Sequence, residues 1–382
     1  MLYRLVITFI LVTSCSTLFA AENPAAISSA LKRAGTNRSQ IQAALDRSPA
    51  KQQEGMQFLV AHMPDQDLKT LTTEFLLENV RLAYQAREES SWKANIPNDI
   101  FLNNVLPYAT INERRDRWRK DFHDRFRPLI KDIQSPGLAA TKLNQNISKL
   151  TKVKYSTKRA KADQSPYESM ESGLASCTGL SVLLVDACRS VGIPARVVGT
   201  PLWTNKSGNH SWVEIWDNGW HFTGACEATG DSLDRGWFVG RAATAKRDEL
   251  IHAIYAVSYK RTPQFFPMVW AADNRTVHAV NVTDRYTRKK EKLPEGVVIV
   301  MFRAMAQSTG ERLVTTIKVT DQAGKVMFSG KTKDERFDAN DHVAVQLRLG
   351  QQYQVTFGNG PTGTTQPLKV SKADQLVTLP LP

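Results

Sequence analysis

The spacing of apolar residues changes twice along this chain of 382 residues, and this change constrains the fold. From residue 23 to about 147, apolar residues recur every three to five positions, as on one face of an amphipathic helix. From about 164 to 288 helical and strand-like patterns are mixed, and beyond Pro294 apolar and polar residues alternate. The chain is therefore predicted to be an α+β protein with a helical, a mixed and a β region.

The mixed region contains the clearest local signals. An apolar helix is expected over Thr178–Val191, because Gly192 and Pro194 directly behind it are a typical helix stop. The turn at Asp217-Asn218-Gly219 favours a hairpin. Three short strands are expected: Arg196–Gly199, Ser211–Trp216 and Trp220–Thr223.

The β region is predicted to be a small antiparallel sandwich. Val343, Val345 and Leu347 alternate with polar residues, and the pattern resumes after the turn at Gly350. No residue in this region has a catalytic pattern. We divide the chain into an export signal (1–21), a helical region (22–160), a catalytic domain (161–290) and a β-sandwich domain (291–382).

The N-terminus has the features of an export signal. Arg4 supplies a positive charge, Leu5–Val12 is a short apolar run, and cleavage is expected near Ala20. Residues 12–15 loosely resemble a lipoprotein box with Cys15 as the lipid carrier, but cleavage near Ala20 is our interpretation. We therefore expect a secreted or periplasmic protein without a membrane span.

The chain is basic, with a formal net charge of +13 and a pI of about 9.6. This charge favours contact with an anionic polymer or surface, although a basic exported enzyme without such a partner fits equally well. No zinc-finger or RNA-binding pattern is present, so no nucleic-acid partner is expected. The arginine-rich stretch 114–127 is interpreted as a solvated charged face over the buried rings of Trp118 and Phe122.

Cys177 is the candidate nucleophile. It begins the apolar helix among small polar residues, where unpaired N–H groups and the helix dipole favour a thiolate. Cys188 lies within the helix among apolar residues, as a buried structural cysteine would. With Cys226, three cysteines remain after cleavage, which suggests one disulfide and one free thiol without identifying the pair.

A thiolate nucleophile requires a base, and His210 is the candidate. It opens a strand whose alternation places His210, Trp212 and Glu214 on one face. His221, in the neighbouring hairpin, is its main rival.

Three blocks in order resemble the transglutaminase-like superfamily: Cys177-Thr-Gly-Leu-Ser, Gly192-Ile-Pro-Ala-Arg196 and His210-Ser-Trp-Val-Glu. The resemblance implies a papain/transglutaminase-like core and a Cys177–His210–acid triad acting through a thioester. The family acid follows a tryptophan by four positions, where this chain has Gly224. Glu227 is taken as the third member; Asp231, or no acid at all, is the alternative.

Two residues are expected to contact the substrate. Gln164 would help to stabilise the oxyanion that forms when the thiolate attacks the substrate carbonyl, and Trp203 lies on a loop before His210. No cofactor is expected, because no phosphate loop or His-Glu-x-x-His zinc motif occurs. No metal is expected either, because Cys177, His210 and Cys226 lack paired ligand spacing. The predicted function is cysteine-dependent acyl transfer on an amide of a peptide, a glutamine side chain or a cell-wall peptide. The alternatives are a binding protein that retains the fold, and a surface anchor acting through basic helices.

Overall fold

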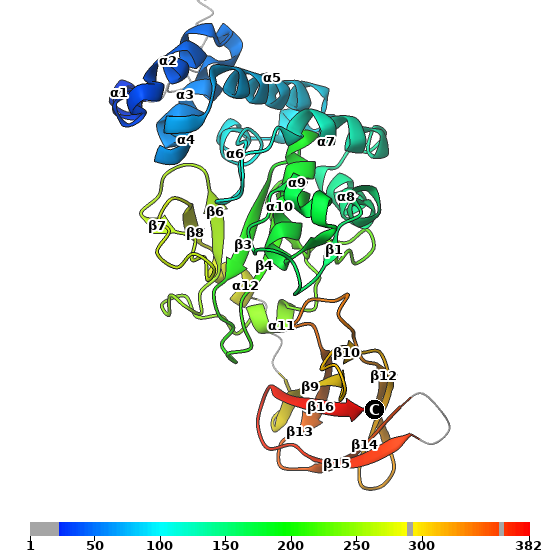
Figure 1. The fold of residues 1–382 in the computed structure, drawn as a ribbon. Helices are drawn as coiled ribbons and strands as arrows, with labels where there is room; N and C mark the ends of the chain where they lie inside the picture. The colour runs from blue at the N-terminus through cyan, green and yellow to red at the C-terminus, as the bar shows by residue number, and fades with distance from the viewer. Residues whose placement is uncertain (1–22, 289–292, 359–362) are drawn as a thin grey trace, which may run out of the picture.

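The computed structural model describes residues 23–288, 293–358 and 363–382. The predicted export signal, with Cys15 and Ala20, lies outside these residues. Figure 1 shows N-terminal helices at one end, a central sheet with its helices in the middle, and a smaller group of strands at the other end. The predicted α+β class is confirmed.

The N-terminal region is helical, as its apolar spacing predicts. Thr72 and Ser135 cap two of the longer helices from the position before the first helical residue, and each side chain accepts a hydrogen bond from a backbone N–H in the first turn. The helices are α1 Pro24–Arg33, α2 Arg38–Arg47, α3 Gln53–His62, α4 Asp65–Thr70, α5 Thr73–Glu89, α6 Asn98–Asn104, α7 Trp118–Phe126 and α8 Pro136–Thr151.

The middle of the chain forms an antiparallel six-stranded sheet in the order β5-β4-β3-β6-β8-β7. The helices and strands of this part of the chain are α9 Pro166–Ser172, α10 Cys177–Ser190, β3 Ala195–Thr200, β4 His210–Trp216, β5 Trp220–Thr223, α11 Val239–Ala242, β6 Tyr255–Ser258, β7 Gln264–Phe265, β8 His278–Asn281 and α12 Thr283–Thr287. Two short strands pair in parallel: β1 Lys154–Tyr155 lies before α9, and β2 Leu174–Ala175 lies between α9 and α10.

One hydrophobic core joins the N-terminal helices to the sheet. It runs from Ala30 in α1 through Leu183 in α10 to Ala279 in β8. This core continues across the boundary predicted at residue 160 between the helical region and the catalytic domain. Above the opposite face of the sheet lies a second, aromatic cluster that includes Trp212 and Phe238.

The end of α10 is held against the helical region at a position that requires glycine. Gly192 has φ +79°, and a Cβ there would lie 2.5 Å from the carbonyl oxygen of Ala86 at the end of α5. The indole of Trp92 donates a 2.9 Å hydrogen bond to the Gly192 carbonyl. This close packing fixes α10, and with it the residue at its N-terminus.

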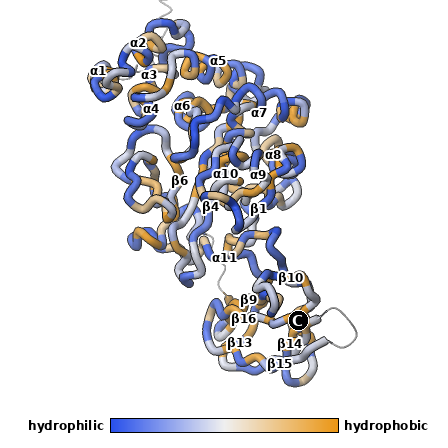
Figure 2. The backbone as a smooth tube through the Cα atoms, in the orientation of Figure 1, coloured by the Kyte–Doolittle hydropathy of each residue, from blue (hydrophilic) through white to orange (hydrophobic). Residues whose placement is uncertain are grey.

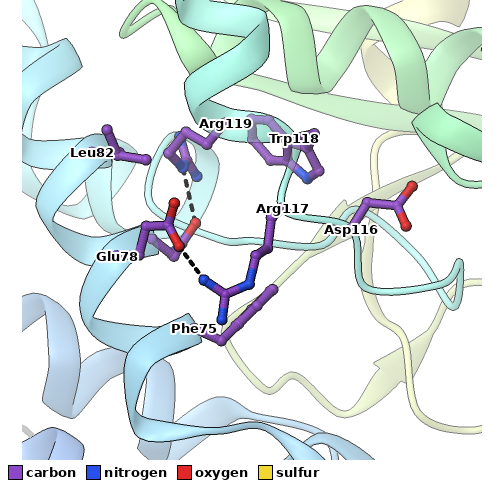
Figure 3. A pocket seen from close by; sticks show the side chains of 8 residues that line it. Phe75, Glu78, Leu82, Asp116, Arg117, Trp118 and Arg119 are labelled. Atoms are coloured by element: carbon purple, nitrogen blue, oxygen red, sulfur yellow. Dashed lines mark hydrogen bonds and ion pairs between the residues drawn. The ribbon is translucent and has the colours of Figure 1, made fainter.

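The arginine-rich stretch only partly matches the prediction. Trp118 and Phe122 are buried as expected, but Arg119 is also buried and donates to the carbonyls of the loop after α6. Arg117 remains exposed and pairs with Glu78 beside a pocket between α5 and α7 (Figure 3). The interpretation of a fully solvated charged face is therefore wrong for Arg119, because unpaired backbone carbonyls attract its guanidinium.

The C-terminal region forms two four-stranded sheets around its own core, as predicted. Its alternating residues point inward and outward in turn, and Figure 2 shows hydrophobic and hydrophilic residues mixed along these strands. Strand β16 pairs with β9 in parallel, which departs from a purely antiparallel arrangement. The strands are β9 Val297–Ala306, β10 Arg312–Leu313, β11 Thr316–Thr320, β12 Val326–Lys331, β13 Val343–Arg348, β14 Gln352–Phe357, β15 Thr364–Lys369 and β16 Gln375–Leu381.

The loop between β12 and β13, residues 332–342, contacts the central domain. The side-chain amide of Asn340 donates to the carbonyl of Asn209, just before β4, at 3.2 Å. The backbone N–H of Ala339 donates to the hydroxyl of Tyr155 on β1 at 2.9 Å. We call residues 332–342 the docking loop, because these bonds hold it beside the start of β4.

Within the described residues, no helix has the length and apolar character needed to cross a bilayer.

Candidate active site

Cys177 is the first residue of α10, as the sequence predicts. The hydroxyl of Ser176 caps the helix by accepting from the N–H of Gly179 at 3.0 Å, and it donates to the carbonyl of Ala162 at 2.7 Å. These two bonds fix the backbone just before the thiol. Cys177 is partly exposed, so its sulfur stands at the surface end of a buried helix.

His210 is the first residue of β4 and pairs with Thr200 of β3. The hydroxyls of Thr178 and Ser211, each one residue further along, hydrogen-bond to each other at 3.0 Å. This bond ties the start of α10 to the start of β4. As a result the Cys177 sulfur and a ring nitrogen of His210 lie within 4.8 Å of each other.

Aromatic rings surround the His210 imidazole, which is only 1% exposed. The nearest ring is that of Trp237, with its centroid 4.7 Å away, and Phe238 follows at 5.1 Å. Trp212 and Trp203 lie at 5.8 and 6.1 Å and stack on each other. Trp203, predicted to contact substrate, is thus buried beside His210.

The carboxylate closest to His210 comes from the docking loop. Oδ2 of Asp338 lies 3.5 Å from Nδ1 of His210, and both residues are at most 2% exposed. Oδ1 of Asp338 accepts from the N–H of Asn340 at 2.9 Å, and Arg312 donates to the Asp338 carbonyl. No catalytic pattern was found in the sandwich, yet folding brings a carboxylate of its loop beside His210, which no local pattern could reveal.

The pKa values of His210 and Asp338 are shifted more by the neighbouring charges than by burial. Burial alone would lower the pKa of His210, but the charges of Asp338 and Cys177 raise it well above its usual value. Burial alone would raise the pKa of Asp338, but the imidazolium of His210 lowers it. The pair is therefore most stable as imidazolium and carboxylate.

Glu227, the predicted triad acid, lies close to the position that the family acid would occupy. A side chain on Gly224 would collide with the carboxylate of Glu227, so the glutamate fills that space. Its Oε2 accepts from the indole N–H of Trp237 at 3.0 Å, and that ring contacts His210. Burial raises the pKa of Glu227 to about 7, although the charge of His210 lowers it.

The other acidic and imidazole candidates are engaged elsewhere. Asp231 is exposed and accepts from Gln145 at 2.9 Å. His221 hydrogen-bonds to Asp234 at 2.7 Å, and both side chains are well exposed. His221 and Asp231 are thus not part of the group that contains Cys177.

Gln164, the other predicted substrate contact, is buried and committed to its own loop. Its amide nitrogen donates to the carbonyl of Leu174 at 3.0 Å and to the hydroxyl of Ser172 at 3.1 Å. Its carbonyl oxygen has no hydrogen-bond partner among the described residues. Gln164 therefore supports the segment that leads to Cys177.

The three described cysteines are all free, which corrects the expectation of one disulfide. Burial raises the pKa of Cys188, and it raises that of Cys226 to about 12. Both residues are therefore poor nucleophiles near neutral pH, and Cys177 is the thiol best placed to react.

Glu214, on the same face of β4 as His210, has a structural environment. It is fully buried and pairs with Arg196 of β3 at 2.7 Å and with Arg285 of α12. The hydroxyl of Tyr286 donates to it at 2.9 Å. This network fastens β3, β4 and α12 together and so holds His210 in position.

Tyr155 is a neighbour of the site that sequence reasoning missed. Burial, together with the nearby charges of Asp338 and Cys177, raises the pKa of its hydroxyl. Trp237 and Phe238 were missed for the same reason as Tyr155 and Asp338: each is distant in sequence from the three blocks, and only the fold brings it close.

Cys177 and His210 both lie within a stretch that matches a known protein family. Residues 126–225 match the sequence model of the transglutaminase-like superfamily. No curated protein matches the chain.

Two solved structures resemble the chain in part. A candidate cysteine protease from Cytophaga hutchinsonii is 16% identical, with a TM-score of 0.29; the match covers 51% of this chain and 60% of that one. Red sea bream transglutaminase is 10% identical, with a TM-score of 0.32, covering 74% and 66%. This chain spans less than two thirds of either.

Proposed function

Because residues 126–225 carry a transglutaminase-like core, we propose that this protein is a cysteine-dependent acyl-transfer enzyme acting on amide bonds. The observation that carries the proposal is the approach of Cys177 and His210 to within 4.8 Å. These residues are far apart in sequence, and the hydrogen bond between Thr178 and Ser211 holds their elements together. A nucleophile beside a base is the minimal arrangement for this chemistry.

The first half-reaction forms a thioester. The sulfur of Cys177, as a thiolate, attacks the carbonyl carbon of the substrate amide. His210, as an imidazolium, donates its proton to the leaving nitrogen as the carbon–nitrogen bond breaks. The products are a free amine or ammonia and an acyl group bound to Cys177.

The second half-reaction frees the enzyme. Neutral His210 takes a proton from water or from an acceptor amine, which attacks the thioester and displaces the thiolate. Water yields a carboxylic acid, and an amine yields a new amide. We favour hydrolysis of a peptide or cell-wall amide, because bulk water competes well at a thiol that is partly exposed.

Backbone N–H groups at the start of α10 are suited to stabilise the oxyanion. Cys177 and Thr178 are the first two residues of α10, and a helix makes no internal use of its first N–H groups. The N–H of Gly179 is already taken by the Ser176 cap.

The third member of the site has two candidates. Glu227 retains its predicted role as the group that orients His210; its place beside Gly224 and its bond to Trp237 support this role. Asp338 is nearer to Nδ1 and supports the imidazolium by its charge. Glu227→Gln should lower kcat if Glu227 orients the imidazole, and full activity in this variant would leave it a structural residue.

We propose a secreted or periplasmic enzyme whose basic surface meets an anionic polymer, on the basis of the N-terminal pattern and the net charge of +13. The substrate class proposed is a protein, peptide or cell-wall amide.

The test is an assay of purified protein against protein and cell-wall peptide amides, followed by mass spectrometry. Release of ammonia, of new amino termini or of cross-linked product identifies the reaction. Cys177→Ala should abolish all three, whereas Cys226→Ala, which removes another thiol, should retain them. Equal turnover by wild type and Cys177→Ala would refute the proposal. Binding of these amides without turnover would favour the non-catalytic alternative.

A further inference from the structure

The Cys177–His210–Asp338 group has an unusual shape for a catalytic relay. One donor atom from each residue lies within 4.8 Å of the other two, so the sulfur and the carboxylate are close to each other. In a linear relay the sulfur and the carboxylate would bond to opposite nitrogens of the imidazole. Two hydrogen bonds alone span about 6 Å, and the ring between them would add to this separation. The three groups form a compact triangle instead of a line.

The triangle has the donor types of a transition-metal site, and the edge between His210 and Asp338 has the length that such a site requires. Thiolate, imidazole and carboxylate are the three ligand types that bind Zn²⁺. With bond lengths of about 2.1 Å, ligand nitrogen and oxygen atoms on a tetrahedral Zn²⁺ lie about 3.4 Å apart. The distance from Nδ1 of His210 to Oδ2 of Asp338 is 3.5 Å.

A second observation points to a missing ligand. Neither ring nitrogen of His210 makes a hydrogen bond of good geometry with the described residues, although the residue is only 1% exposed; Nδ1 has only the 3.5 Å ion-pair contact with Asp338. A buried imidazole without a well-formed hydrogen bond is costly, and a metal ion would satisfy one of its nitrogens. The surrounding rings of Trp212, Trp237 and Phe238 exclude water from most of the imidazole.

The carboxylate is already oriented for ligation. Oδ1 of Asp338 is occupied by the N–H of Asn340, and Arg312 holds the Asp338 backbone, which leaves Oδ2 facing His210. Such supporting bonds are typical of ligands in metal sites. Cys177 is partly exposed, so a fourth position remains open on the side of the sulfur.

We propose that Cys177, His210 and Asp338 bind one Zn²⁺ ion through Sγ, a ring nitrogen and Oδ2, with the fourth position open to water. The ion holds the thiol as a bound thiolate and so blocks its attack on an amide. Because Asp338 belongs to the docking loop, the ion also bridges the sandwich to the central domain. The sequence predicted no metal site, because Cys177, His210 and Cys226 lack paired ligand spacing; the fold instead brings Asp338 to Cys177 and His210.

The test uses the full chain after removal of metal with a chelator, and it does not depend on finding a substrate. Co²⁺ is titrated as a spectroscopic probe, and Zn²⁺ is then added as competitor. We expect one equivalent of Co²⁺ with tetrahedral visible bands and a sulfur-to-cobalt charge-transfer band, all displaced by one equivalent of Zn²⁺.

Variants identify the ligands. Cys177→Ala should remove the charge-transfer band, and Asp338→Asn and His210→Gln should each weaken Zn²⁺ binding at least about tenfold. Cys226→Ala and Asp234→Asn remove the same residue types outside the triangle and should bind like wild type. Melting temperature offers a second readout: Zn²⁺ should raise that of wild type more than that of Asp338→Asn. Unchanged affinity in either Asp338→Asn or His210→Gln, or no stoichiometric binding by wild type, would overturn the proposal.

Discussion

Neutralising Glu214 should destabilise the central domain by several kilocalories per mole. Its carboxylate is fully buried and pairs with Arg196, whose side chain is 7% exposed, at 2.7 Å. Glu214→Gln keeps the shape of the side chain but leaves the guanidinium of Arg196 buried without a counter-charge. Breaking a buried ion pair in this way costs about 3–5 kcal/mol.

Urea unfolding followed by tryptophan fluorescence measures this loss. All eight tryptophans precede residue 271, so the signal reports the helical and central regions and not the sandwich. Glu249→Gln is the matched control, because its pair with Lys246 is half exposed and should contribute at most about 1 kcal/mol. A loss below about 1 kcal/mol for Glu214→Gln would refute the claim that this network fastens β3, β4 and α12.

Three further perturbations test separate parts of the structure. Gly192→Ala should cost at least about 1–3 kcal/mol in the same urea assay, because of its positive φ and the approach of Ala86; an unchanged midpoint would contradict the packing of α10 on α5. The pKa of Glu227 is raised in the fold from 4.5 to about 7 by burial, so the unfolded chain releases this proton first as pH rises. Wild type should therefore lose roughly 3 kcal/mol between pH 4.5 and pH 8, and Glu227→Gln should lack this loss; parallel pH profiles of the two proteins would argue against burial of the carboxyl. Tyr155→Phe removes the acceptor of the Ala339 N–H, so amide hydrogen exchange in the docking loop should speed up several-fold in this variant; protection equal to wild type would show that other contacts hold the loop.

Local patterns predicted the parts of the fold that local physics determines. The apolar run after Cys177 and the stop at Gly192 defined α10, and the hairpin turn before Trp220 defined β4 and β5. Alternation beyond Pro294 predicted the sandwich. In each case the signal and the element occupy the same short stretch of chain.

Contacts between distant segments could not be predicted in the same way. Asp338 approaches His210 across 128 positions, through a loop with no unusual composition. Glu227 is a prediction that rests on the resemblance alone: Gly224 stands where the family has its acid, and Glu227 is the next carboxylate in the sequence. Arg119 was misjudged because its burial depends on carbonyl groups of the loop after α6, which the sequence does not place near it.

The most direct test of the central claim is the alkylation rate of each cysteine in the native protein, because thiolates react with iodoacetamide far faster than thiols. Metal-free protein is labelled for short times, and peptide mass spectrometry follows Cys177, Cys188 and Cys226 separately. We predict that Cys177 is modified fastest, and that His210→Gln slows it whereas His221→Gln, the matched control on the neighbouring strand, does not. Labelling of Cys226 at the rate of Cys177, or an unchanged Cys177 rate in His210→Gln, would contradict the account of a thiolate paired with His210.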